Sequence, residues 1–82
     1  MLDIKKAIED LSKMGFRCEE GTTESAEPSV TAIFQTARGP LEVFAIEAGA
    51  RFGKPNGTVK FYYKISNARL LAAARQTIKA NG

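Results

Sequence analysis

The sequence predicts an α+β fold in which an N-terminal and a C-terminal helix pack on one face of an antiparallel sheet of three or four strands. Apolar residues recur at helical spacing near both ends of the chain, and the middle is rich in β-forming residues separated by turn residues. The length of 82 residues leaves room for one hydrophobic core. We therefore expect a single domain over residues 1–82, with its elements in the order α-β-β-β-α.

The N-terminal helix is predicted by a stripe of apolar side chains with charged residues on the other side. The stripe consists of Ile4, Ala7, Ile8, Leu11 and Met14. Asp3 precedes it and is suited to accept hydrogen bonds from the free N–H groups of the first turn. Gly15 follows the stripe, where a left-handed residue commonly ends a helix.

The strands are predicted from runs of β-forming residues and from the turns between them. Arg38-Gly39-Pro40 separates two such runs and indicates a hairpin. Residues 21–28 are polar and end in proline, which favours a loop. Residues 49–57 hold three glycines and two cations, which favours a mobile basic connection. The predicted strands are an extra short strand at 16–20 and strands at 29–37, 41–48 and 58–65.

The last predicted strand alternates between two sets of side chains. The set expected to face the helices is Val59, Phe61, Tyr63 and Ile65. Lys60, Tyr62 and Lys64 would then form a row on the outer face of the sheet. The two strands of the hairpin carry apolar residues on both faces, including Ile33, Phe44 and Ile46. A sheet covered on one face only would leave some of these exposed, which indicates a partner and suggests a second copy of the chain.

The C-terminal helix is predicted over residues 67–80, with Ser66 or Asn67 as its N-cap. Its apolar arc consists of Leu70, Leu71, Ala74 and Ile78. The cations Arg69, Arg75 and Lys79 lie on the opposite side of the helix, where we expect solvent.

The predicted order of elements, ending in an alanine-rich helix with basic residues, resembles that of double-stranded-RNA-binding domains and of the related HicA-like mRNA interferases. The RNA-binding family opens its last helix with a Lys-Lys pair that contacts phosphates. Here the corresponding stretch is Ser66-Asn67-Ala68-Arg69-Leu70, which lacks that pair. The interferases depend on a histidine, and this chain has none. The resemblance therefore implies a fold and no activity.

Charge is segregated along the chain. The first 47 residues hold all nine acidic residues and five cations, a formal charge of −4. The last 35 residues hold seven cations and no acidic residue, a formal charge of +7. A basic half of this kind attracts polyanions or acidic protein surfaces, unless acidic residues of the first half fold over it.

Catalytic chemistry is poorly represented. Without histidine the chain lacks the commonest general base and the commonest metal ligand, and its neighbouring carboxylates point apart on a helix or a strand. One cysteine, Cys18, cannot build a disulfide or a structural zinc site, and we expect it to be a small buried side chain. We therefore expect a protein that is not an enzyme and has neither cofactor nor metal.

The N-terminus becomes charged at once, and no apolar run approaches the roughly 20 residues of a membrane span. These features favour a cytoplasmic protein with no membrane partner.

Our leading hypothesis is a binding module that contacts nucleic acid, mainly at phosphates, through the basic C-terminal half. The candidate binding residues are Arg51, Lys54, Lys60, Tyr62, Lys64, Arg69, Arg75 and Lys79. The alternative is a small protein-binding inhibitor or adaptor, for example of a phage type, that uses the same cations against an acidic surface and self-associates. Exposed apolar residues at positions 41–46 would favour this protein-binding alternative.

Overall fold

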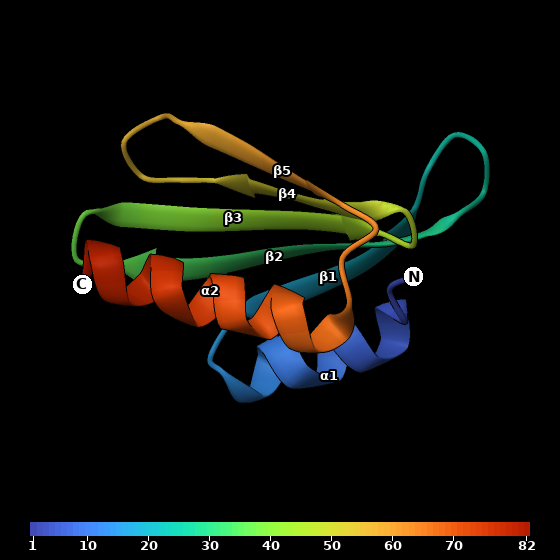
Figure 1. Cartoon of the computed structure of the whole chain (residues 1–82), viewed down its shortest axis with the longest axis horizontal. Coiled ribbons are helices and arrows are strands. Elements are labelled where there is room, and N and C mark those ends of the chain that lie inside the picture. The colour runs from blue at the N-terminus through green and yellow to red at the C-terminus, as the bar shows by residue number, and fades with distance from the viewer.

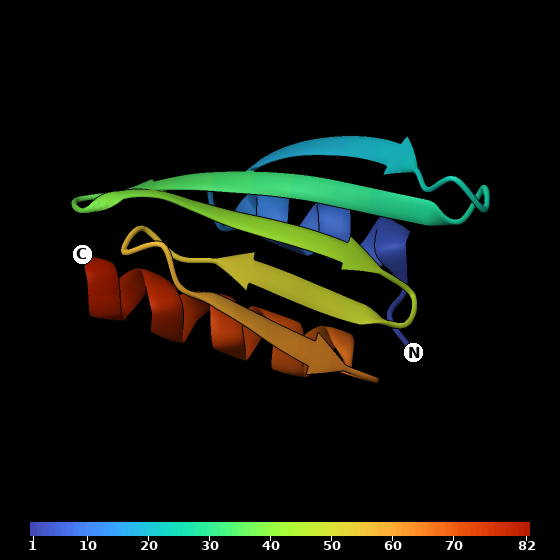
Figure 2. The ribbon, with the colours of Figure 1, turned by 90° about the horizontal axis from the view of Figure 1, so that it is seen from above.

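The computed structural model describes all 82 residues and contains two helices and a five-stranded antiparallel sheet. The elements are α1 (Ile4–Lys13), β1 (Arg17–Thr22), β2 (Pro28–Thr36), β3 (Gly39–Ile46), β4 (Gly49–Gly53), β5 (Val59–Tyr63) and α2 (Asn67–Asn81). The strands form a meander in which each pairs with the next, in the order β1-β2-β3-β4-β5. Both helices lie on one face of this sheet, and the other face is left open (Figures 1 and 2).

The α+β class and the packing of both helices on one face are confirmed, and the extra strand predicted at 16–20 is present as β1. The fifth strand comes from residues 49–57, which the sequence favoured as a mobile connection. That interpretation was wrong for the first five of these residues, which form β4. Ala50 and Phe52 alternate into the core and are buried, so burial outweighs the weak strand preference of the flanking glycines.

The two helices begin side by side and are joined at their first residues (Figure 1). Asp3 caps α1 by accepting a hydrogen bond from the backbone N–H of Lys6 at 3.0 Å, and Ser66 caps α2 by accepting one from Arg69 at 3.2 Å. The backbone N–H of Asp3 also donates to Oδ1 of Asn67, while Nδ2 of Asn67 donates to the carbonyl of Asp3, both at 2.9 Å. These two bonds fix the start of one helix against the start of the other.

The hydrophobic core lies between the sheet and the helices. Its largest fully buried side chains are Leu2, Leu11, Val30, Leu41, Val43, Phe52 and Leu70, which come from both helices, three strands and the N-terminal residue that precedes α1. One core therefore joins the two ends of the chain. Cys18, which was expected to be a small buried side chain, is half-buried against this core, with its Sγ 3.8 Å from the carbonyl oxygen of Ile8 in α1.

The side chains of β5 face the opposite way from the prediction. Val59, Phe61 and Tyr63 were expected in the core, but they lie on the open face and are 52%, 56% and 80% exposed. Cross-strand pairing sets this phase, because Tyr62 pairs with the buried Ala50 of β4 and so shares its inward face. Tyr62 packs edge-on against Phe52, with ring centroids 5.2 Å apart.

Ile65 nevertheless reaches the core, as predicted, and is only 3% exposed. In a regular strand it would share the face of Tyr63. Lys64, between them, adopts a left-handed backbone with φ of 55° and donates its N–H to the carbonyl of Ala48 at 2.9 Å. This single left-handed residue breaks the alternation and turns the chain toward α2.

Candidate binding surfaces

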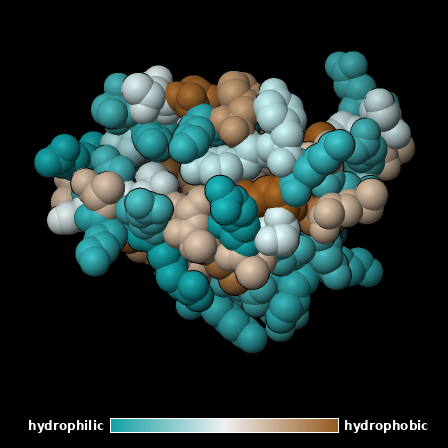
Figure 3. Space-filling view, in the orientation of Figure 1, coloured by the Kyte–Doolittle hydropathy of each residue, from teal (hydrophilic) through white to brown (hydrophobic).

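The open face of the sheet carries most of the apolar side chains that no helix covers. Strand register places Ile33, Phe44, Ile46, Val59, Phe61 and Tyr63 on this face. The helices lie behind the sheet when this face is viewed directly (Figure 2). Brown and tan side chains also appear at the top of Figure 3, over the β4–β5 hairpin, while the lower part of the same view, over α1, is mostly hydrophilic. An uncovered apolar face of this kind is typical of an interaction surface.

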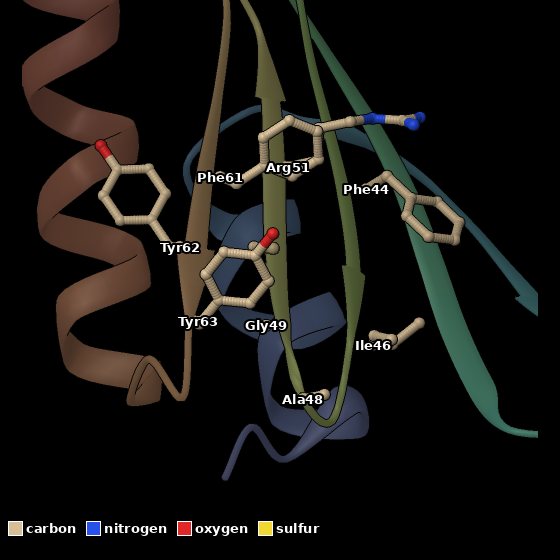
Figure 4. Close-up of a pocket in the computed structure, with 9 residues that line it drawn as sticks. Phe44, Ile46, Ala48, Gly49, Arg51, Phe61, Tyr62 and Tyr63 are labelled. Carbon is tan, nitrogen blue, oxygen red and sulfur yellow. The ribbon is translucent and has the colours of Figure 1, made fainter.

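A shallow apolar hollow of about 200 Å³ lies on the open face between β3 and β5 (Figure 4). Phe44 forms one side and Phe61 and Tyr63 form the other, while Gly49 leaves its floor without a side chain. The rings of Phe61 and Tyr63 are nearly parallel, with centroids 6.4 Å apart and an angle of 12° between their planes. Tyr62 points the other way, toward α2.

Arg51 is the one cation at this hollow, and its charge is partly neutralised. Its guanidinium carbon lies 5.3 Å from the centroid of the Phe44 ring, and its Nη2 lies 4.0 Å from a carboxylate oxygen of Glu42. Across the whole open face, Arg17 and Arg51 are matched in number by Glu19 and Glu42. The open face is therefore apolar and close to neutral, which suits an apolar partner better than a phosphate backbone.

The cations beyond Glu47 remain largely free of acidic neighbours. Of the seven, only Arg51 has a carboxylate oxygen within 4.0 Å. The other two ion pairs of the protein lie within α1, where Lys6 pairs with Asp10 at 3.4 Å and Lys13 with Glu9 at 3.3 Å. The acidic half therefore makes no ion pair with the other six cations, and the charge separation in the sequence persists in the fold.

The eight predicted binding residues do not share one face. The expected outer row of Lys60, Tyr62 and Lys64 is wrong, because the inward phase of Tyr62 also turns Lys60 toward the helix side, where its Nζ lies 5.3 Å from the Tyr62 ring centroid. Arg51 stands on the open face, and Lys64 is exposed in the connection to α2.

The remaining candidates lie on the turn and on the last helix. Lys54 is half-buried in the β4–β5 turn, and Arg69, Arg75 and Lys79 are exposed on α2. The structure thus separates a basic surface, made of α2 and the adjoining β5 edge, from the apolar open face.

Sequence reasoning missed Phe61 and Tyr63 as surface residues, although it identified Phe44 and Ile46 as apolar residues in need of cover. The missed signal is the alternation of Ala50 and Phe52 between two glycines, which indicates a strand. Recognising that strand would have provided the neighbour that sets the phase of β5.

Comparisons with protein-family models, with curated proteins and with solved structures find no match. Neither of the two helices has the length and apolar composition that crossing a membrane requires. Function is therefore argued from the two surfaces themselves.

Proposed function

We propose that the protein is a non-catalytic nucleic-acid-binding module that contacts mainly phosphates through α2 and the adjoining edge of β5. The observation that carries this proposal is the absence of any carboxylate within 4.0 Å of six of the seven C-terminal cations. Unpaired cations on one part of a surface produce a coherent positive potential and attract polyanions.

The centre of the proposed site is the solvent-facing side of α2. Arg69, Arg75 and Lys79 are all exposed there, and the arc between them holds mostly small residues such as Ala68 and Ala72. The helix rises about 1.5 Å per residue, so the three cations extend over about 15 Å of its length. Such a row matches several successive phosphates, and small neighbours allow the backbone of a nucleic acid to approach.

Contacts with phosphate rather than with bases are expected from the chemistry of this surface. It combines lysine and arginine with alanine, and Gln76 is its one exposed side chain suited to read the edge of an adenine. Phosphate contacts fix position and supply affinity without selecting sequence. We therefore expect binding with little sequence preference and a strong dependence on salt.

A second candidate function is the docking of a protein with an acidic surface, as an inhibitor or adaptor. The observation that favours it is that Phe44 and Ile46 are only partly covered. Both lie within residues 41–46, where exposed apolar residues favour a protein partner over a nucleic acid. Phe61 and Tyr63 extend the same apolar surface. This candidate makes the open face, rather than α2, the main contact.

The test is a titration of the protein into labelled double-stranded RNA, duplex DNA and single strands at several salt concentrations. The variant Arg69→Gln/Arg75→Gln/Lys79→Gln should lose at least about tenfold in affinity, and its salt dependence should fall by about 2 to 3 in the slope of log K against log salt. The control Lys5→Gln/Lys6→Gln/Lys13→Gln removes the same charge from α1 and should retain near wild-type binding. An absence of binding at low salt, or equal losses in both variants, would contradict the proposal.

A further inference from the structure

The open face of the sheet requires an occupant that is apolar at its centre and carries charges of both signs. The face itself fits that description, because its aromatic centre is flanked by Arg17, Glu19, Glu42 and Arg51. We propose that a second copy of the chain covers it, so that the protein is a symmetric dimer with the two sheets packed face to face and the helices outside. The two-fold axis of this dimer runs parallel to the strands, in the plane between the sheets.

The backbone of the face alone supplies more than half of the area of a standard contact. Five strands about 4.8 Å apart, at about 3.3 Å per residue, give a footprint on the order of 500 Å² before side chains are counted, against about 800 Å² per partner in a standard interface. The three exposed side chains of β5 project from this footprint and add to the area available. Two sheets packed in this way lie about 10 Å apart, with their apolar side chains interdigitated.

The charged side chains on the open face select the direction of the axis. Glu19 lies on β1 and Arg51 on β4, in the same row of the register as Phe44 on β3. An axis parallel to the strands reverses the strand order between the copies, so it places β4 over β2 and brings Arg51 toward Glu19 of the other copy. An axis perpendicular to the strands through this row would instead place β4 over β4 and β1 over β1, and so oppose Arg51 to Arg51 and Glu19 to Glu19.

The pairing register shows which residues then meet. Glu19, Thr31, Phe44, Arg51 and Phe61 form one row across the sheet, from β1 to β5. The axis passes over the central strand, so Phe44 packs against Phe44 of the second copy. Arg51 comes to lie over β2 of the second copy, next to Glu19 on the neighbouring strand. The symmetry produces this Arg51–Glu19 contact twice.

A second row supports the same arrangement. Gly21, Ser29, Ile46, Gly49 and Tyr63 also lie across the sheet in register. Reversal of the strand order places the 80% exposed ring of Tyr63 over Gly21 of the second copy, which has no side chain to obstruct it. Glu42 lies near the axis and approaches its own copy, and Arg51, 4.0 Å away in the same chain, offsets that charge.

Symmetric pairing through the sheet edges is disfavoured by the charges of the two edge strands, β1 and β5. Pairing β5 with β5 would bring together two segments without an acidic residue, and pairing β1 with β1 would bring together two acidic ones. Of the symmetric contacts that the sheet offers, face-to-face packing with the axis along the strands alone joins opposite charges.

The first test is the mass of the protein in solution. Sedimentation equilibrium between roughly 5 and 500 µM covers the range in which a micromolar Kd changes the average mass. We expect the wild-type mass to rise from 8.9 kDa toward twice that value. Phe61→Ser/Tyr63→Ser, which alters only exposed side chains of β5, should remain monomeric with an unchanged circular dichroism spectrum. A wild-type protein that stays monomeric throughout would overturn the proposal.

The second test is a charge exchange. Arg51→Glu and Glu19→Arg should each be monomeric, because every Arg51–Glu19 contact then joins like charges. Mixing the two variants should restore the dimer, since a heterodimer recovers both contacts. Lys5→Glu, an exposed change on α1 away from the interface, should retain the wild-type dimer. A mixture that stays monomeric while the wild type dimerises, or single variants that dimerise like the wild type, would overturn the proposed axis.

Discussion

At the scale of single residues, Gly49 of β4 lies so close to the backbone of β5 that it leaves no room for a side chain. A Cβ atom built on Gly49 would overlap the carbonyl oxygen of Tyr62, which belongs to the strand ladder and cannot move freely. We expect Gly49→Ala to lower the free energy of unfolding by about 2 to 3 kcal/mol, as for overpacked interior sites. Urea denaturation would measure this loss. Gly53→Ala is the matched control in the same strand, because its nearest contact is an ordinary 3.8 Å, and equal losses in both variants would contradict the argument.

Lys64 is the second residue with a distinct backbone requirement. Its φ of 55° is strained for any residue other than glycine. This conformation separates the exposed Tyr63 from the buried Ile65. We expect Lys64→Gly to stabilise the fold by about 0.5 to 1 kcal/mol and the β-branched Lys64→Val to destabilise it by at least about 1 kcal/mol. Thermal denaturation would measure both. Lys60→Gly, in the regular part of β5, should lower the stability of the fold. Stabilisation by Lys60→Gly would show that the effect of glycine is not specific to the left-handed backbone of Lys64.

At the scale of elements, the two helices were predictable because each carries one apolar stripe and a capping residue within a short stretch of sequence. The number of strands, and which side chains of β5 face the core, were predicted less well. Residues 49–53 were assigned to a loop because glycines flank them, although Ala50 and Phe52 alternate as in a strand and pack into the core. The orientation of β5 was mispredicted because its more apolar set, Val59, Phe61 and Tyr63, faces outward. Its pairing with β4 decides which face is buried, and pairing is a long-range property.

The contact between the two helices is a further property of elements that sequence does not show. Asn67 joins α2 to α1 through two hydrogen bonds with the backbone of Asp3, across 64 residues of chain. We expect Asn67→Ala to lower the free energy of unfolding by about 1 kcal/mol, because the partners of both bonds stay accessible to water. Urea denaturation would again measure it. Asn81→Ala removes one bond, to the carbonyl of Thr77 near the end of the same helix, and should cost less than about half as much. An equal loss of unfolding free energy in the two variants would show that the Asn67 side chain does not stabilise the contact between the helices.

At the scale of the whole molecule, the separation of charge was the best-predicted feature of the surface. It could be predicted because strands that follow one another in a meander also lie side by side, so a gradient along the sequence becomes a gradient across the sheet. The composition of the basic surface was predicted less well. Lys60 and Tyr62 belong to the helix side of β5, and the aromatic residues of the open face came from the set assigned to the core. An error about which face of a strand points outward leaves the predicted net charge of that region unchanged. The same error changes which aromatic residues are predicted to be exposed.

The two proposed surfaces lie on opposite sides of the chain, and this separation leads to a prediction about the whole assembly. In the face-to-face dimer both α2 helices remain on the outside, so each dimer presents two basic surfaces. Phe61→Ser/Tyr63→Ser should therefore bind a short oligonucleotide, which occupies one α2, with the affinity of the wild type. The same variant should lose the large complexes that a bivalent dimer forms with a long nucleic acid. Electrophoretic mobility shifts with short and long duplexes would measure both effects. A parallel loss of short-oligonucleotide binding would mean that the open face itself contacts the nucleic acid, because α2 is unchanged in this variant.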